Sequence, residues 1–255
     1  MAWNPAQYLK FGDERLRPGF DLLARVGELP PGPICELGCG TGAHARAIAA
    51  RWPERSLTAI DSSAEMLAKA SVEPSSVQWM RADIATWSAP EPLALIFSNA
   101  TLHWLNGHER LFPHLLRQLT PGGVLAVQMP RNHGAPSHTL MAEMAREKVW
   151  ASRLLPILRE EPTQPPAFYY DLLSGVAKGG IDLWETEYLH LLQGDDAALN
   201  WIRGTALRPL LDALEPGEGE AFSDRLAAQL REAYPKRPDG RTLFPFRRLF
   251  LIAQA

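Results

Sequence analysis

The stretch that most constrains the fold of this chain is residues 34–42, Ile-Cys-Glu-Leu-Gly-Cys-Gly-Thr-Gly. A short apolar run is followed by glycines at alternate positions, Gly38, Gly40 and Gly42, and then by a helical segment, residues 43–52. Glycine lets the backbone take positive φ and approach a ligand closely, and the start of a helix offers unpaired N–H groups and a positive dipole end. The pattern therefore predicts a parallel strand, a tight turn and a helix that hold a nucleotide-like ligand.

Composition and charge narrow the class of protein. The chain has 255 residues, of which 46% are hydrophobic and 22% charged, as in an ordinary globular protein. Its net charge of −3 argues against a nucleic-acid partner, since phosphate binding requires a basic surface. No stretch approaches the ~18 apolar residues of a membrane span, and the first residues lack the pattern of a signal peptide. We therefore expect a protein that binds a small molecule, without nucleic-acid or membrane partners.

The two cysteines, Cys35 and Cys39, both lie in the opening stretch. A disulfide between them would tie up the loop that has to hold the ligand, and no second pair completes a zinc site. We expect buried thiols and a cytoplasmic protein, because disulfides are rare in that compartment. His133 and His138 suggest a metal pair, but no carboxylate or cysteine accompanies them at ligand spacing, so we expect no metal.

Apolar runs alternate with helical segments in the first half of the chain. This alternation predicts an α/β fold with a doubly wound, mainly parallel sheet. Two residue pairs, Ser62 with Glu65 and Asn106 with Glu109, fit capping boxes for the helices after the second and fourth strands. The expected strands of this half are residues 34–37, 57–60, 77–80, 93–97 and 124–129.

We expect a single domain built around this sheet. The alternation breaks at Pro130, and prolines within residues 162–166 mark a loop. The first segment has two interpretations: a helix packed on the sheet edge, or a flap over the ligand with Tyr8 and Arg15 reaching into the site. The expected segments are an N-terminal helical flap (1–32), a cofactor-binding half (33–130), a helical lid insertion (131–180), and a C-terminal half with a helical insertion and the last strands (181–255).

Polar residues follow the ends of successive expected strands. Asp61, Asp83 and Asn99 come after the second, third and fourth strands, as the glycines come after the first. In open parallel sheets, ligands bind outside the carboxyl ends of the strands. The agreement among separate elements predicts one pocket at that edge more firmly than any single motif does.

Two cofactors fit an acidic residue that follows the second strand behind a glycine-rich loop. For NAD, residues 38–43 match the loose form of the dinucleotide motif, and Asp61 lies about 20 residues further on. For S-adenosylmethionine, Glu36 would neutralise the ammonium group and Asp61 would bind the ribose hydroxyls. Asp83 would accept a hydrogen bond from the adenine amine while Ile84 packs on the ring. These extra partners favour S-adenosylmethionine, and NAD stays open as the alternative.

As a set, these motifs resemble the class I S-adenosylmethionine-dependent methyltransferases. The resemblance rests on residues 36–42, Asp61, Asp83-Ile84, Asn99 and 119–123. It implies a Rossmann-like, seven-stranded sheet whose last strand, residues 247–253, is antiparallel, and it implies S-adenosylmethionine as the cofactor. The implied cofactor-binding residues are Tyr8, Glu36, Gly38, Gly40, Gly42, Asp61, Ser62, Met66, Asp83, Ile84 and Asn99.

A closer resemblance covers nearly the whole chain. Residues 3–11, 99–104, 127–130, 201–209 and 239–250 are similar to the trans-aconitate 2-methyltransferase family, which esterifies one carboxylate of trans-aconitate. The chain departs from that family's pattern at Ala206, where glycine is usual. The resemblance implies a small-molecule tricarboxylate substrate. A methyltransferase for another small molecule and a non-catalytic ligand-binding relative are the alternatives.

A carboxylate substrate defines what the site has to do. The carboxylate is already ionised at neutral pH, so its attack on a sulfonium methyl group needs alignment rather than a general base. Arginine suits the clamping of the other carboxylates, through bidentate pairing. His103 and Trp104, after the fourth strand, are positioning candidates, although both also fit a structural role, and no residue is firmly assigned to catalysis. The substrate-binding candidates are Arg15, Arg131, Arg203 and Arg208, with Tyr170 as a wall.

Overall fold

The computed structural model describes residues 12–159 and 161–255, which form two compact units. The sheet unit comprises Asp13–Pro130, Pro162–Thr186 and Arg248–Ala255. The helical unit comprises, among the described residues, Arg131–Glu161 without residue 160, and Glu187–Arg247. The change of unit after Pro130 falls where the strand–helix alternation breaks in the sequence. The expectation of one domain with a lid stays a prediction.

The strands form one seven-stranded sheet in the order β3-β2-β1-β4-β5-β7-β6. Strands β1 to β5 pair in parallel, whereas β7 runs antiparallel to β5. The predicted Rossmann-like α/β fold with an antiparallel last strand is therefore confirmed. The strands are β1 (Ile34–Leu37), β2 (Leu57–Asp61), β3 (Gln78–Arg81), β4 (Leu93–Asn99), β5 (Leu119–Pro130), β6 (Ile181–Leu192) and β7 (Thr242–Gln254).

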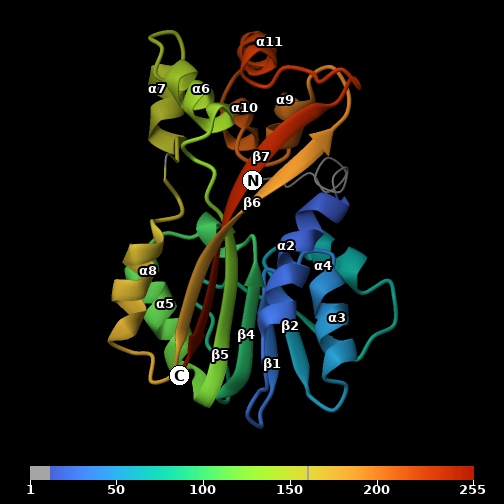
Figure 1. The fold of residues 1–255 in the computed structure, drawn as a ribbon, viewed down its shortest axis with the longest axis vertical. Helices are drawn as coiled ribbons and strands as arrows, with labels where there is room; N and C mark the ends of the chain where they lie inside the picture. The colour runs from blue at the N-terminus through green and yellow to red at the C-terminus, as the bar shows by residue number, and fades with distance from the viewer. Residues whose placement is uncertain (1–11, 160) are drawn as a thin grey trace. The chain divides into compact units, whose positions relative to one another are not determined.

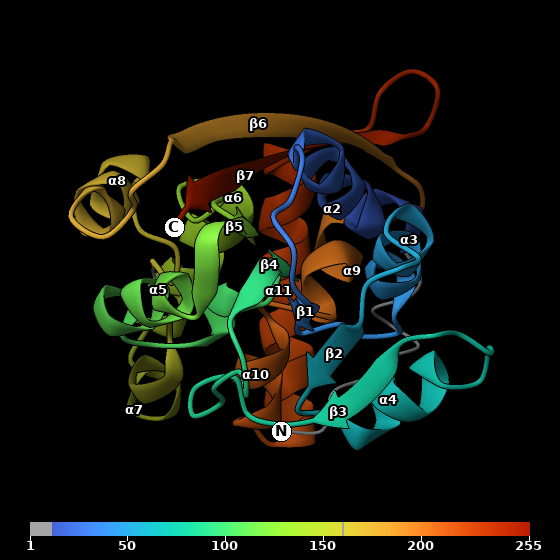
Figure 2. The ribbon, with the colours of Figure 1, turned by 90° about the horizontal axis from the view of Figure 1, so that it is seen from below.

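Helices cover both faces of the sheet in the sheet unit. Figures 1 and 2 show α2 and α3 on one face and α5 and α8 on the other. Every residue of β4 is buried, as expected for a central strand covered on both faces. The helices of this unit are α2 (Gly12–Arg25), α3 (Ala43–Arg51), α4 (Ala64–Ala70), the 3₁₀ turn η1 (Leu102–Trp104), α5 (His108–Arg117) and α8 (Pro166–Ser174).

The helical unit has its own core, which is rich in aromatic side chains. The rings of Trp150 and Phe222 meet edge to face with centroids 4.9 Å apart, and Trp201 lies 5.8 Å from Phe244. None of the helices in the part of the chain that the structure describes is long and apolar enough to cross a membrane. The helices of this unit are α6 (Pro136–Ala145), α7 (Ala151–Leu154), η2 (Leu155–Ile157), α9 (Ala197–Arg203), α10 (Arg208–Asp212) and α11 (Pro216–Ala233).

Two predicted helix caps are wrong by one residue. Ser63, not Ser62, is the N-cap of α4: its backbone is extended and its Oγ accepts from the Met66 N–H at 3.2 Å. Helix α5 is capped by Gly107 rather than Asn106, with a left-handed φ of 72°. In both cases the sequence offers adjacent residues suited to a cap, and the geometry of the preceding strand or turn decides which one takes the position.

Candidate functional site

The glycine-rich stretch forms the turn between β1 and α3, as predicted. Gly38, Gly40 and Gly42 all have positive φ, at 75°, 55° and 80°. The N–H groups of Gly38 and Cys39 donate to the carbonyl of Ile60 on β2, at 2.7 and 2.9 Å. The turn is therefore fixed against the neighbouring strand, with α3 starting directly after it.

The three glycines differ in the space around them. A Cβ added at Gly38 would lie 2.1 Å from Oγ1 of Thr101, and one at Gly42 would lie 2.3 Å from the Trp79 ring. A Cβ at Gly40 would meet no atom of the described residues within 4 Å. Gly38 and Gly42 thus allow close packing inside the protein, whereas Gly40 leaves its backbone open to a ligand.

Asp61 is the last residue of β2 and joins two loops. Its Oδ2 accepts from the Gly40 N–H at 2.9 Å, and its Oδ1 accepts from the Ser63 N–H at 2.8 Å. Each carboxylate oxygen keeps a second lone pair. The side chain therefore holds the glycine loop and the start of α4 in register while retaining capacity to accept from a ligand hydroxyl.

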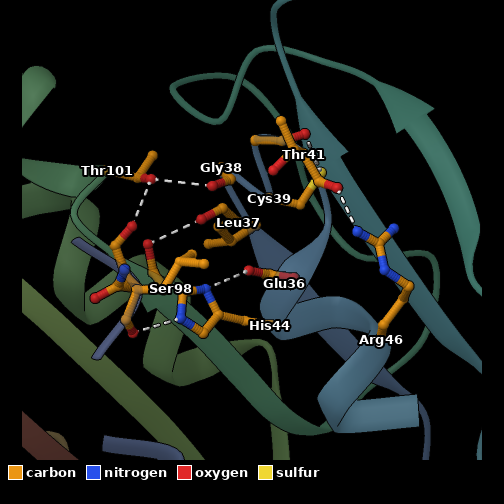
Figure 3. A network of polar contacts seen from close by, with 12 residues as sticks. Glu36, Leu37, Gly38, Cys39, Thr41, His44, Arg46, Ser98 and Thr101 are labelled. Atoms are coloured by element: carbon orange, nitrogen blue, oxygen red, sulfur yellow. Dashed lines mark hydrogen bonds and ion pairs between the residues drawn. The ribbon is translucent and has the colours of Figure 1, made fainter. Parts of the chain in front are cut away.

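Glu36 lies on β1 and is buried, with 1% of its surface exposed. Its Oε1 lies 3.9 Å from Nδ1 of His44 on α3. A dashed line in Figure 3 marks this contact. Its Oε2 has no hydrogen-bond partner among the described residues. An unpaired buried carboxylate oxygen is costly, which makes this atom a candidate to meet a cationic ligand group.

The surroundings of Glu36 hold its pKa well above the ordinary range. Burial raises the pKa of this carboxyl group to about 8, with the negative charge of Asp61 adding to the effect. The guanidinium of Arg46 and the backbone N–H of Ala45 oppose the shift. Burial also lowers the pKa of His44, so the ring beside Glu36 is neutral at pH 7. A cation brought to Oε2 would favour the ionised form of Glu36.

The other predicted cofactor residues in the sheet unit lie at the ends of β2 and β3. Ser62 is exposed directly after β2, and Met66 is buried in the first turn of α4. Asp83 is exposed and its Oδ1 accepts from the Ala85 N–H at 2.9 Å, while the neighbouring Ile84 side chain is buried. The predicted residue Tyr8 lies outside the described residues.

Asn99 ends β4, where it is 9% exposed, and its Oδ1 has no hydrogen-bond partner among the described residues. The next residue, Ala100, has a left-handed φ of 52°, a conformation that costs a non-glycine residue roughly 1–2 kcal/mol. The Thr101 hydroxyl donates to the carbonyls of Gly38 and Asn99, at 3.2 and 3.1 Å. Thr101 therefore joins the end of β4 to the glycine loop.

The positioning candidates His103 and Trp104 lie on η1, in the sheet unit. His103 is buried and Trp104 is 37% exposed, with their ring centroids 4.8 Å apart. The chain after β4 thus carries an aromatic pair a few residues from Asn99. Their roles beside the reacting groups stay predictions.

The predicted substrate residues are divided between the two units. In the sheet unit, Arg15 is buried on α2, whereas Tyr170 is 54% exposed on α8, which covers the other face of the sheet. In the helical unit, Arg131 directly follows β5, and Nε of Arg208 pairs with Oδ1 of Asp212 at 2.8 Å. Their roles in substrate binding stay predictions.

Sequence reasoning did not identify two residues that organise this site, His44 and Thr101. His44 is the second residue of α3 and Nε2 lies 3.0 Å from the carbonyl of Leu16. His44 bonds to Leu16 and Thr101 bonds to Gly38, and because both partners are distant in the chain, neither contact has a local sequence signal. The only hint is their closeness to motif residues, His44 after Gly42 and Thr101 after Asn99.

The cysteines lie in the sheet unit and the pair His133–His138 lies in the helical unit. Cys35 and Cys39 are free and buried. The rings of His133 and His138 have centroids 5.5 Å apart, and burial lowers the pKa of His138 to about 3. Among the described residues, no group of three or more His, Cys, Asp or Glu side chains is arranged to hold a metal ion.

The site has the chemistry that S-adenosylmethionine requires. It combines an open glycine backbone at Gly40, an unpartnered buried carboxylate oxygen on Glu36, and an acceptor at the end of β2 in Asp61. The ligand has an ammonium group and a ribose diol, which match the two carboxylates. The residues present therefore fit this cofactor.

Known structures resemble this chain in fold. The YcgJ protein from Bacillus subtilis has a TM-score of 0.59 at 15% identity, and the alignment covers 93% of this chain and 98% of that one. A phosphoethanolamine N-methyltransferase 2 from Haemonchus contortus, solved with S-adenosyl-L-methionine, has a TM-score of 0.55 at 16% identity, covering 93% of this chain and 52% of that one. At these identities the likeness establishes the fold alone.

Sequence comparison gives information on the family as well as the fold. Residues 34–123 match the family described as "Methyltransferase domain". The chain is 46% identical to the trans-aconitate 2-methyltransferase of Azoarcus sp. (strain BH72), over 99% of this chain and 98% of that protein. It is 42% identical to the trans-aconitate 2-methyltransferase of Rhizobium meliloti (strain 1021), again over 99% of this chain and 98% of that protein. The chain therefore belongs to the trans-aconitate 2-methyltransferase family.

Proposed function

We propose that this protein is an S-adenosylmethionine-dependent O-methyltransferase that forms a monomethyl ester on one carboxylate of trans-aconitate. The observation that carries the proposal is the 46% identity to a trans-aconitate 2-methyltransferase along 99% of the chain. That likeness extends far beyond residues 34–123, the part that matches the general methyltransferase domain. It therefore includes the residues before and after that general domain.

The cofactor supplies a methyl group bound to a positively charged sulfur. The open backbone at Gly40 would face it, Glu36 would bind its ammonium group, and Asp61 would accept from its ribose hydroxyls. Asp83 and Ile84 would bind the adenine ring. The remaining residues proposed for this pocket are Tyr8, Gly38, Gly42, Ser62, Met66 and Asn99.

The chain acts on the substrate by binding and orientation. The reacting carboxylate is ionised at neutral pH, so the work of the site is to hold oxygen, methyl carbon and sulfur in line. His103 and Trp104 are proposed to border the reacting groups, and Tyr170 and Arg208 to contact the acid. The proposed clamps for the other carboxylates are Arg15, which is buried on α2, and Arg131.

The clamp proposal predicts a specific kinetic change. Arg131→Ala should raise the KM for trans-aconitate by roughly tenfold or more, because a charge-assisted hydrogen bond contributes about 1.5–3 kcal/mol. The Kd for S-adenosylmethionine, measured by calorimetry, should change little. Equal effects on both constants would mean that Arg131 is not a substrate clamp. Arg117→Ala, on α5 of the sheet unit, serves as a charge-matched control.

The function is tested with a panel of acids and methyl-labelled cofactor. We expect transfer of label to trans-aconitate, and weaker or no transfer to cis-aconitate, citrate and isopropylmalate. Failure to label any acid would defeat the carboxylate proposal. Direct binding measurements with NAD and S-adenosylmethionine test the cofactor. Tight binding of NAD without binding of S-adenosylmethionine would favour an NAD-dependent oxidoreductase instead.

We also propose that the enzyme works in the cytoplasm on a small-molecule tricarboxylate, without nucleic-acid or membrane partners. Both cysteines are free thiols, which suits a reducing compartment. The net charge of −3 does not provide the basic surface that nucleic-acid binding needs. Cell fractionation with a tagged chain tests the location.

A further inference from the structure

His44 is a polar side chain in an unusually closed environment within the sheet unit. Only 4% of its surface is exposed. Its ring contacts two phenylalanines, with centroids 4.8 Å from Phe20 on α2 and 5.9 Å from Phe97 on β4. A buried imidazole must find hydrogen-bond partners or lose stability, so the placement of its two nitrogens is informative.

Helix α2 is shaped to receive this ring. A Cβ at Gly19 would lie 2.2 Å from Nε2 of His44 and 2.7 Å from two ring carbons. Glycine inside a helix costs roughly 0.5–1 kcal/mol relative to alanine. At this position it allows the ring to approach the helix backbone, where the Leu16 carbonyl lies 3.0 Å from Nε2.

These contacts fix which nitrogen carries the proton. The Leu16 carbonyl can only accept, so Nε2 is the N–H that donates to it. The neutral ring then presents an unprotonated Nδ1 to the Glu36 carboxyl group, whose Oε1 lies 3.9 Å away. Figure 3 shows the ring of His44 directed toward Glu36. The imidazole therefore occupies the space on one side of the carboxyl group, next to Oε1.

The other carboxylate oxygen is left available. Oε2 of Glu36 has no hydrogen-bond partner among the described residues, although the side chain is 1% exposed. Two charged groups also act on Glu36: Asp61 at the end of β2 raises its pKa, and Arg46 on α3 lowers it. The side chain is thus buried within the protein while one acceptor remains for a cation.

We propose that His44 is a positioning residue for the cofactor: it holds the Glu36 carboxyl group toward the amino-acid end of S-adenosylmethionine and links helix α2 to that contact. This inference rests on the proposed cofactor, not on the proposed substrate. Helix α2 contributes through Gly19 and the Leu16 carbonyl. The orientation of the helix and the affinity for the ammonium group are therefore coupled.

The test compares two ligands that differ at the amino-acid end. S-Adenosylhomocysteine keeps the ammonium group, whereas 5′-methylthioadenosine has the same nucleoside and thioether without it. His44→Phe cannot donate to the Leu16 carbonyl, so the ring loses its anchor beside Glu36. Binding of S-adenosylhomocysteine should weaken by about tenfold, the size expected for a lost hydrogen bond. Binding of 5′-methylthioadenosine, measured by the same calorimetry, should change by less than about twofold.

Two further variants separate positioning from a structural role. His44→Gln keeps a donor that can reach the Leu16 carbonyl and should recover part of the lost affinity. Gly19→Ala displaces the ring without altering it and should reproduce the selective loss. Gly27→Ala is the matched control, because a Cβ there meets no described atom within 4 Å and the residue lacks positive φ.

The outcomes distinguish the alternatives. Equal weakening of both ligands in His44→Phe and Gly19→Ala would show that the residue only supports the fold and would overturn the proposal. Unchanged affinity for S-adenosylhomocysteine in folded Gly19→Ala would also overturn it. A selective loss together with no methyl transfer to any acid would support His44 as a positioning residue while the proposed substrate failed.

Discussion

The two units of this protein differ in whether they bury an acidic side chain. In the sheet unit, Glu36 is buried and one of its oxygens has no hydrogen-bond partner among the described residues. In the helical unit, every described acidic side chain is at least partly exposed. Several of these pair with surface cations, in Arg153–Glu218, Arg225–Glu147, Arg231–Asp196 and Lys236–Asp195.

This difference indicates one place where the chain accepts a cost in stability. Burying an unpaired polar group is unfavourable by roughly 1–3 kcal/mol, so a protein that retains one gains something else from it. Exposed ion pairs contribute about 0–1 kcal/mol and are easily exchanged. We infer that the sheet unit carries the cofactor chemistry, while the helical unit contributes a core that stabilises itself.

The largest expected effect tests whether damage to the helical core leaves cofactor binding by the sheet unit unchanged. Trp150 is 4% exposed and packs edge to face on Phe222. Trp150→Ala should lower the free energy of unfolding by about 3–5 kcal/mol, as for other large core truncations, measured by urea denaturation. The Kd for S-adenosylhomocysteine should stay within about twofold under conditions where the variant is folded. A large loss of cofactor affinity would break the proposed division between the units.

A second prediction separates the two kinds of glycine in the loop of the sheet unit. Gly38→Ala combines positive φ with a Cβ 2.1 Å from Thr101. It should therefore lower the free energy of unfolding by about 2–4 kcal/mol. In Gly40→Ala only the backbone strain remains, so the free energy of unfolding should fall by about 1–2 kcal/mol. Because the space at Gly40 belongs to the proposed ligand, this variant should nonetheless lose most of its cofactor affinity. Retained affinity in Gly40→Ala would place the ligand elsewhere.

The third prediction concerns pH and Glu36. Its pKa is raised from 4.5 to about 8, so the folded state binds this proton more tightly than the unfolded state. The stabilisation is fully present below pH 4.5 and is lost as pH rises toward 8. Between these pH values, the unfolding free energy of the wild type should fall relative to that of Glu36→Gln by on the order of 2–4 kcal/mol.

The comparison with Glu36→Gln isolates this group. Both proteins contain His44, whose pKa burial lowers and whose effect on stability has the opposite sign. That contribution cancels in the difference to the extent that the substitution leaves the histidine environment unchanged. Urea denaturation of both proteins across the pH range makes the measurement, and parallel pH profiles would contradict the raised pKa.

The smallest expected effect lies on the surface of the helical unit. Glu147 forms a bidentate pair with Arg225, at 2.8 and 2.9 Å, with both side chains more than one-third exposed. Glu147→Gln should change the unfolding free energy by less than about 1 kcal/mol. Glu143→Gln, an exposed position on α6, is the matched control. A loss well above that of the control would show that surface pairs support this unit more than the comparison implies.

Much of the fold was predictable because its signals are local. The strands β1 to β5 were expected from short apolar runs, and the structure has strands at all five places. The glycine stretch was expected to be a turn before a helix, and all three glycines have positive φ. These features depend on the conformational preferences of residues that are adjacent in the chain, and such preferences can be inferred from the sequence.

The substrate side of the site stays a prediction. Arginines were chosen for their chemistry; in the structure Arg15 is buried on α2 and Arg208 pairs with Asp212 four residues further along its helix. Whether an arginine is available to a carboxylate depends on its neighbours in space. Composition and spacing do not contain that information.

The sequence by itself determined the order of strands and helices, the positive-φ turn and the family of this chain, because each follows from short patterns of residues. Only the tertiary structure decided that Gly38 and Gly42 pack against Thr101 and Trp79 while Gly40 stays open. It also decided that Glu36 meets His44, and that His44 bonds to a carbonyl on α2. Such contacts join residues far apart in the chain, and they exist only once the sheet and its covering helices have assembled.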